Sequence, residues 1–166
     1  MAVVASGNLS VSLTSHSVKG IDLSAAGNVA DILLSIEQAY ANGTGSGYMQ
    51  QVFADARTLG DGANETIDLQ AVTNPHGDTI VSINVKVMAI KNRSATQTLT
   101  VGNAAATQFT AWCGAAAHTR TIPPLGWEIW GAAGGGTVDG THKDIKVLNS
   151  AGAGCDYDIV VLACTS

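Results

Sequence analysis

The sequence predicts an all-β protein: an antiparallel β-sandwich, jelly-roll-like, with an extended N-terminal arm. Apolar and polar residues alternate in about seven to nine short segments, Gly, Asn and Pro cluster between them, and no fixed repeat indicates a solenoid or propeller. At 166 residues the chain is long enough for one well-packed domain. We therefore predict an N-terminal arm or first strand over residues 1–17 and a single β-sandwich domain over residues 18–166.

The arm contains the first alternating segment. Leu9, Val11 and Leu13 alternate with serine and threonine, so one side of this segment is apolar and the other carries hydroxyls. An extended segment of this kind can add a strand to a neighbouring sheet. We expect Met1 to Ser17 to reach a partner subunit and Leu9, Val11 and Leu13 to be its partner-binding side chains.

The segment from Val29 to Tyr40 fits two patterns. Apolar residues three and four positions apart favour a helix, with Asn28 as a possible N-cap. The alternation of Ile32, Leu34 and Ile36 instead fits a strand. Periodicity alone favours the helix.

The second half of the chain carries the clearest strand patterns. A long central strand is predicted from Val81 to Ala89. Pro123 and Pro124 indicate a sheet edge or corner, because proline lacks the backbone donor of a central strand. The stretch from Asp144 to Ala163 reads as two strands around a glycine-rich turn, and we expect these two strands to form a hairpin.

The surface is predicted to be unusually neutral. Only 13% of the residues are charged, about half the usual fraction, and Ser, Thr, Asn, Ala and Gly take their place. Such a surface protects a free monomer poorly and is typical of a protein in an assembly. The net charge of −5 and the absence of a basic run argue against a nucleic-acid partner.

Localisation and redox state follow from two further features. No apolar stretch approaches the roughly 20 residues of a membrane span, and the N-terminus lacks the pattern of a secretory signal, so we expect synthesis in the cytoplasm and no membrane partner. Cys113, Cys155 and Cys164 have no C-x-x-C spacing. They are expected to be buried reduced thiols rather than zinc ligands or disulfide partners.

No catalytic residue, metal site or cofactor is predicted. The loop from Gly43 to Tyr48 lacks the lysine of a phosphate-binding loop and the third glycine of a dinucleotide fingerprint. The histidines are far apart in sequence and are expected in surface loops: His16, His76, His118 and His142. The clustered acids are better explained as solvated strand edges than as ligands or a catalytic pair: Asp139, Asp144, Asp156 and Asp158.

The three tryptophans raise the question of sugar binding, because aromatic side chains on a β-sandwich can stack on glycans. Trp127 and Trp130 are three residues apart, so in a strand they point to opposite faces and do not form one flat platform. We favour a core role for the tryptophans and keep Trp127 and Trp130 as glycan contacts under an alternative function.

Several segments, taken in order, resemble a group of small structural proteins of tailed bacteriophages, over roughly residues 32 to 163. In that group the region matching Leu34 to Tyr40 looks extended, which disagrees with the helical pattern. The segments that carry the resemblance are DARTL at 55–59, ETIDL at 65–69, KVMAIKN at 86–92, LTVG at 99–102, DIKVLNS at 144–150 and YDIVV at 157–161.

The resemblance implies a virion component without enzymatic activity, namely a capsid decoration or cement protein. It implies a β-sandwich that assembles as a homotrimer on the shell and contacts the major capsid protein. One alternative is a receptor-binding or fibre-associated head that binds host glycans. A polysaccharide hydrolase is the other, and it would need paired carboxylates facing one cleft.

Overall fold

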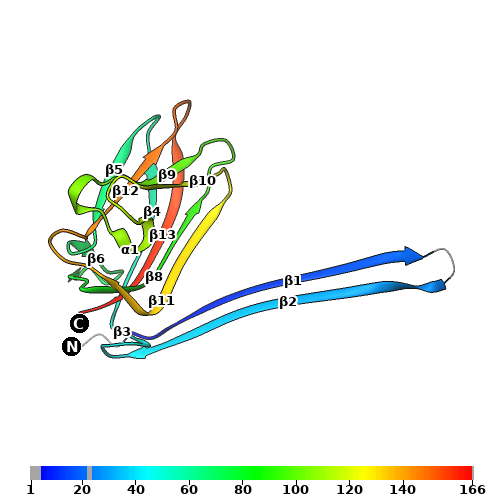
Figure 1. The fold of residues 1–166 in the computed structure, drawn as a ribbon. Helices are drawn as coiled ribbons and strands as arrows, with labels where there is room; N and C mark the ends of the chain where they lie inside the picture. Colours follow the sequence, from blue (N-terminus) through cyan, green and yellow to red (C-terminus); the bar gives the residue numbers. More distant parts are fainter. Residues whose placement is uncertain (1–4, 22–23, 166) are drawn as a thin grey trace.

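The computed structural model describes the backbone of residues 5–21 and 24–165 and divides it into two parts (Figure 1). Most of the chain forms a two-sheet body. A long hairpin near the N-terminus, which we call the arm, projects away from this body. Within the described residues, no helix is long and apolar enough to cross a membrane.

Two four-stranded antiparallel sheets make up the body. The first sheet has the order β10 (Thr119–Ile122), β9 (Leu99–Gly102), β12 (Asp144–Asn149) and β5 (Asn64–Asp68). The second sheet has the order β11 (Trp127–Thr137), β8 (Asn84–Asn92), β13 (Cys155–Cys164) and β4 (Gln51–Leu59). The remaining elements of the body are short: β6 (Val72–Thr73), β7 (Thr79–Ile80), the 3-10 helix η1 (Ala105–Thr107) and the helix α1 (Thr110–Cys113).

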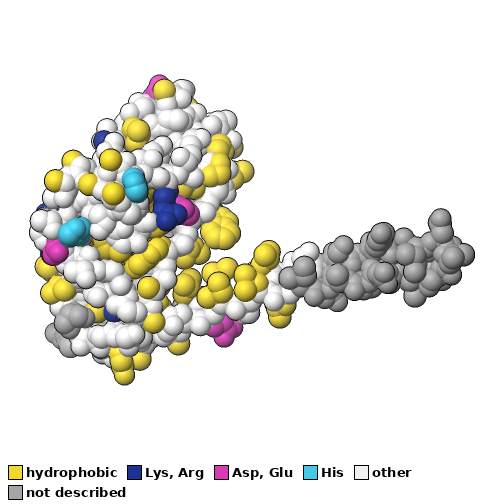
Figure 2. All heavy atoms as spheres, in the orientation of Figure 1, with side chains coloured by type: hydrophobic (Ala, Val, Ile, Leu, Met, Phe, Trp, Pro, Cys, Tyr) yellow, Lys and Arg dark blue, Asp and Glu magenta, His cyan; other side chains and the backbone are white. Residues whose placement is uncertain are grey.

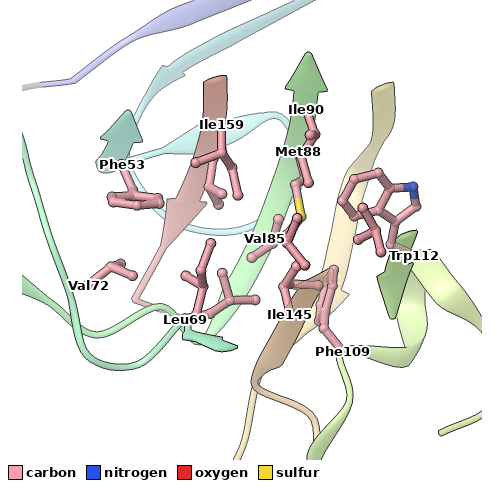
Figure 3. Packing of buried hydrophobic residues seen from close by; sticks show 14 of the residues in the cluster. Phe53, Leu69, Val72, Val85, Met88, Ile90, Phe109, Trp112, Ile145 and Ile159 are labelled. Carbon is pink, nitrogen blue, oxygen red and sulfur yellow. The ribbon is translucent and has the colours of Figure 1, made fainter. Parts of the chain in front are cut away.

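The hydrophobic core lies between the two sheets (Figure 3). Alternation places one apolar row of each strand in this core: Ile145 of β12 comes from the first sheet, and Met88 and Ile159 come from the second. Phe109 and Trp112, from the segment that contains η1 and α1, are buried in the same cluster. The body is thus held together by apolar side chains that the alternating pattern directs inward.

The antiparallel, mostly β prediction is confirmed. The long central strand predicted from Val81 to Ala89 is confirmed as β8 from Asn84 onward, whereas residues 81–83 lie before the strand, with Val81 and Ile83 exposed. The structure contains one short α-helix among the described residues. The strand order does not show the jelly-roll topology, which stays a prediction.

The predicted C-terminal hairpin is wrong. β12 pairs with β5 and β9, whereas β13 pairs with β4 and β8, so the turn after Asn149 crosses from one sheet to the other. The apolar rows of both strands are buried in the same core, and facing each other from opposite sheets buries more apolar surface than lying side by side. Asn149 fixes this crossing, because its side-chain amide donates to the carbonyls of Gly60 and Ala153 at 2.7 Å each.

Of the two patterns that fit Val29 to Tyr40, the strand is the observed one, because this segment lies in β2 (Ser24–Asn42). The helix that periodicity alone favours is wrong, and the extended structure that the resemblance implies for Leu34 to Tyr40 is confirmed. The segment pairs antiparallel with β1 (Gly7–Ile21) over nearly its whole length. The helical spacing of its apolar residues is real, but pairing with β1 satisfies the backbone of both segments at once. The arm is therefore longer than the predicted residues 1–17 and has two strands rather than one.

Candidate interaction surface

One face of the arm is apolar and exposed. Val11 lies opposite Ile36, and Leu13 lies opposite Leu34, so the four side chains point to the same side of the ribbon. Leu13 is 60% exposed, Leu34 52% and Ile36 49%. We call these four residues the arm face.

The opposite face of the arm is mostly polar. It carries Ser10 opposite Glu37 and Ser12 opposite Ser35. Leu33, opposite Thr14, lies on the same side and is exposed. The two faces therefore differ in chemistry as the alternation of Leu9 to Leu13 predicts.

The base of the arm packs on the outer surface of the second sheet. Leu9 continues the row of Val11 and Leu13, and it packs against a small cluster in which Tyr40, Met49 and Val87 are buried. The short strand β3 (Tyr48–Met49), which pairs parallel with β2, supplies Met49 to this cluster. The base is thus fixed to the body by apolar contacts.

Two glycines allow this close approach. A Cβ atom on Gly131 of β11 would lie 3.0 Å from Leu9 Cδ2, and one on Gly7 would lie 2.9 Å from Met49 Sδ. Both distances are shorter than ordinary van der Waals contact. Because glycine has no side chain at these two positions, the first residues of β1 lie directly on the second sheet.

The outer surface of the second sheet stays apolar beyond this contact. Ile129 of β11, Ala89 of β8 and Val160 of β13 form one cross-strand row, and Trp127 lies two residues from Ile129 on the same side. Trp127 is 61% exposed, and Ile129 and Val160 are also exposed. We call Trp127, Ile129, Ala89 and Val160 the sheet patch.

The arm face and the sheet patch belong to one connected apolar surface. Leu9 links it to the arm, and Val87 and Leu162, each two residues from a patch residue, link it to the sheet. Figure 2 shows hydrophobic side chains along the side of the arm that faces the body and on the body above it. A large exposed apolar surface of this kind is typical of an interaction site.

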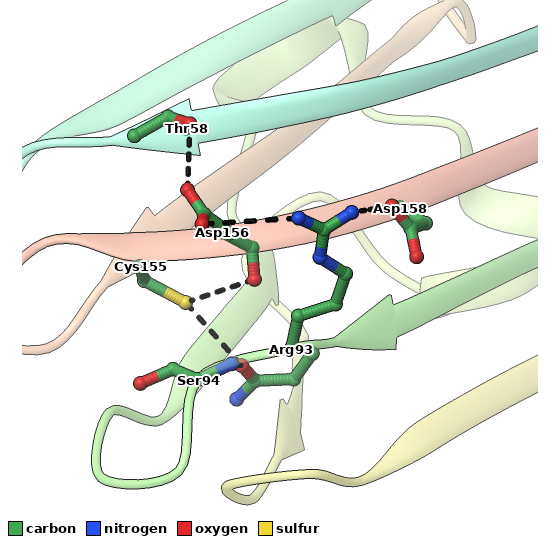
Figure 4. Close-up of polar contacts among 7 residues, drawn as sticks. Thr58, Arg93, Ser94, Cys155, Asp156 and Asp158 are labelled. Atoms are coloured by element: carbon green, nitrogen blue, oxygen red, sulfur yellow. Dashed lines mark hydrogen bonds and ion pairs between the residues drawn. The ribbon is translucent and has the colours of Figure 1, made fainter.

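Charged residues limit the sheet patch at one end (Figure 4). Arg93 lies 3.1 Å from Asp158 and 3.9 Å from Asp156, which also accepts a 2.6 Å hydrogen bond from the Thr58 hydroxyl. These side chains are about half exposed, so each ion pair contributes little stability. The carboxylates of Asp156 and Asp158 are thus held by a cation on the strand surface rather than facing a cleft.

The two tryptophans of β11 lie on opposite faces, as predicted. Trp127 is in the sheet patch, whereas Trp130 packs against the core with its ring edge-to-face on Phe109, at 5.8 Å between centroids and 89° between planes. Trp112 is buried. The structure therefore does not bring Trp127 and Trp130 together as a stacking platform.

The other chemistry-bearing residues are dispersed. Asp144 accepts a 2.6 Å hydrogen bond from the Thr107 hydroxyl. It lies in β12 of the first sheet, whereas Asp156 and Asp158 lie in β13 of the second sheet. Within the described part of the chain, no group of three or more potential metal ligands is present. The three cysteines are buried as predicted, and burial raises the pKa of the Cys113 thiol to about 11.

Asp139 lies in an exposed turn and has a lowered pKa. Its Oδ1 accepts hydrogen bonds from the Thr141 hydroxyl and backbone N–H, both at 2.7 Å, and lies 3.0 Å from His142 Nδ1. These donors favour the ionised form and hold the pKa of Asp139 at about 2 instead of 3.8. Because the folded-state value is the lower one, this turn stabilises the fold above about pH 4 and loses that contribution as the pH falls toward 2.

We predict that Thr141→Val raises the pKa of Asp139 toward 3.8, because the variant removes the hydroxyl donor. An NMR titration of the Asp139 carboxyl carbon measures the shift. Thr121→Val, in exposed β10, is the matched control and leaves the pKa of Asp139 unchanged. A Thr141→Val protein in which Asp139 still titrates near 2 would contradict the assignment.

Sequence reasoning found half of the arm face. Leu9, Val11 and Leu13 lie on one side of β1, as their alternation indicates. Leu34 and Ile36 are not identified as surface residues from the sequence, because their segment fits both a helix and a strand and its periodicity favours the helix. The signal that identifies them is the alternation of Ile32, Leu34 and Ile36, which matches the period of Leu9 to Leu13.

The chain was compared with protein-family models, with curated proteins and with solved structures, and none of them matches. The candidate interaction surface therefore rests on the burial and strand register of this chain alone. It consists of the arm face, the arm base and the sheet patch.

Proposed function

We propose that the protein is a structural component of a tailed-bacteriophage virion and acts as a capsid decoration protein that bridges capsid subunits. The observation that carries the proposal is the arm, a two-stranded ribbon that leaves the body with Leu13, Leu34 and Ile36 exposed. An isolated two-stranded hairpin is at best marginally stable in water. Such an arm gains stability by lying on a neighbouring protein.

The composition supports the same proposal. A surface with few charges contacts other proteins at a low cost of desolvation, because few ions have to leave water. A protein that binds across the seams of a shell adds buried area to each seam and favours the assembled state by mass action. Many copies of a weak contact then act together through multivalency. In this proposal the partners are other copies of the chain, as a homotrimer, and the major capsid protein.

Particles of the phage that encodes this chain test the proposal. We predict that the protein is present in many copies in purified particles by quantitative mass spectrometry. Particles made without it should lose their DNA at a lower temperature, and adding back the purified protein should restore the original temperature. Absence from purified particles would contradict the virion assignment, and unchanged heat resistance on removal would contradict the decoration role. A location on the tail instead of the shell would favour the receptor-binding alternative.

A further inference from the structure

We propose that the arm face of one molecule packs on the sheet patch of a second copy of the same chain. The occupant of the patch is thus an identical arm, and each molecule both provides an arm and receives one. The inference does not depend on the proposed function, because self-association is measured without a virion.

The arm base already shows the contact that the rest of the arm would repeat. Leu9 of the arm and Leu162 of β13 both pack against the cluster that contains Val87, on the outer surface of the second sheet and within the same molecule. The arm continues this apolar row with Val11 and Leu13. Since the same kinds of side chain, with the same strand periodicity, meet at the base, the rest of each surface is complementary to the other.

The two surfaces do not cover each other within one molecule. The arm diverges from the body after its base (Figure 1), and Leu13 and Trp127 remain 60% and 61% exposed. In a pair of molecules both surfaces are available. Neither the arm face nor the sheet patch contains a charged residue. Lys91 is exposed opposite Trp127, with Asp158 next to it in the same cross-strand row, so these charged side chains border the contact at one end.

The size of the contact fits a reciprocal exchange between molecules. Leu13, Leu34 and Ile36 are each about half exposed, so the arm face presents on the order of 300 Å² of apolar side chain. One arm on one patch therefore buries about 600 Å² in total, which is less than a stable interface needs. Reciprocal exchange doubles this area to about 1,200 Å², at the lower limit of stable protein interfaces. The contact is thus expected to form in closed assemblies, in which every arm packs on a patch.

Sedimentation velocity over a range of protein concentrations tests the inference with four proteins. The full chain is expected to sediment as an oligomer at micromolar concentration. Leu13→Ser with Ile36→Ser, in the arm face, and Trp127→Ala, in the sheet patch, should each weaken association at least tenfold. Leu33→Ser is the matched control, because Leu33 is equally exposed but lies on the opposite side of the arm.

A mixing experiment separates this contact from other modes of association. The arm-face variant has an intact patch, and the Trp127→Ala variant has an intact arm, so an equimolar mixture should form mixed oligomers that neither variant forms alone. A thermal midpoint equal to that of the full chain, measured at a concentration where all the proteins are monomeric, shows that both variants are folded. A full chain that is monomeric at every concentration would overturn the inference. So would association that the Trp127→Ala variant retains in full, since the arms would then pack on some other surface.

Discussion

Replacing Trp112 by alanine is expected to lower the free energy of unfolding by about 3 to 5 kcal/mol, the range for removing a large buried aromatic side chain. Trp112 is 2% exposed and lies in the main core cluster, on the short helix α1. Its removal leaves a cavity that the two sheets cannot close without moving. Chemical denaturation, followed by circular dichroism, measures the loss.

Trp127→Ala is the matched control for this substitution, because it makes the same chemical change on the surface. Its free energy of unfolding, measured at a concentration where the protein is monomeric, should stay within about 0.5 kcal/mol of the unchanged protein. Equal losses in the two variants would show that burial of Trp112 is not what stabilises the body.

Asn92→Ala is expected to cost about 3 kcal/mol, because it leaves several buried groups without hydrogen bonds. The Asn92 side-chain amide donates to the carbonyls of Gln97 at 2.7 Å, Pro123 at 3.0 Å and Ile122 at 3.3 Å. Its Oδ1 accepts from the Ser94 backbone N–H at 2.9 Å. One side chain thus joins the end of β8, in the second sheet, to the corner that follows β10, in the first sheet.

The same denaturation experiment tests Asn92→Ala. Asn64→Ala is the control, since Asn64 is exposed in β5 and the change should stay within about 0.5 kcal/mol. If Asn92→Ala unfolds at the same denaturant concentration as the unchanged protein, water or a local rearrangement replaces these hydrogen bonds and the corner is not held by Asn92.

The strands β12 and β13 could be predicted from the sequence because each has one face in the core and one outside, and both show the period of two that this arrangement imposes. β8 is buried on both faces from Val85 to Met88, where the arm base covers Val87. The pairing of β12 and β13 could not be predicted in the same way. The turn from Ser150 to Gly154 is long enough for a hairpin and also for a crossing between sheets, and the choice depends on partners that are distant in sequence.

The arm shows the limit of local periodicity. The segment from Val29 to Tyr40 fits a helix by its own spacing, but its register opposite β1 places Ile36 beside Val11 and Leu34 beside Leu13. Only the pairing of the two segments reveals that the apolar residues form one exposed face. The sheet patch is not predicted for a related reason. The low aromatic content favours a core role for Trp127, and this prediction is wrong because Trp127 is 61% exposed.

Binding of the purified protein to capsids that lack it tests most directly the claim that the chain is a decoration protein whose binding requires the arm face, because the arm face joins its copies into a multivalent assembly. We predict that the full chain and Leu33→Ser saturate the capsid surface and raise its heat resistance. The variant with Leu13→Ser and Ile36→Ser should bind at least tenfold more weakly and give no protection. If this variant occupies and protects the capsid as the full chain does, or if the full chain does not bind, the claim is contradicted.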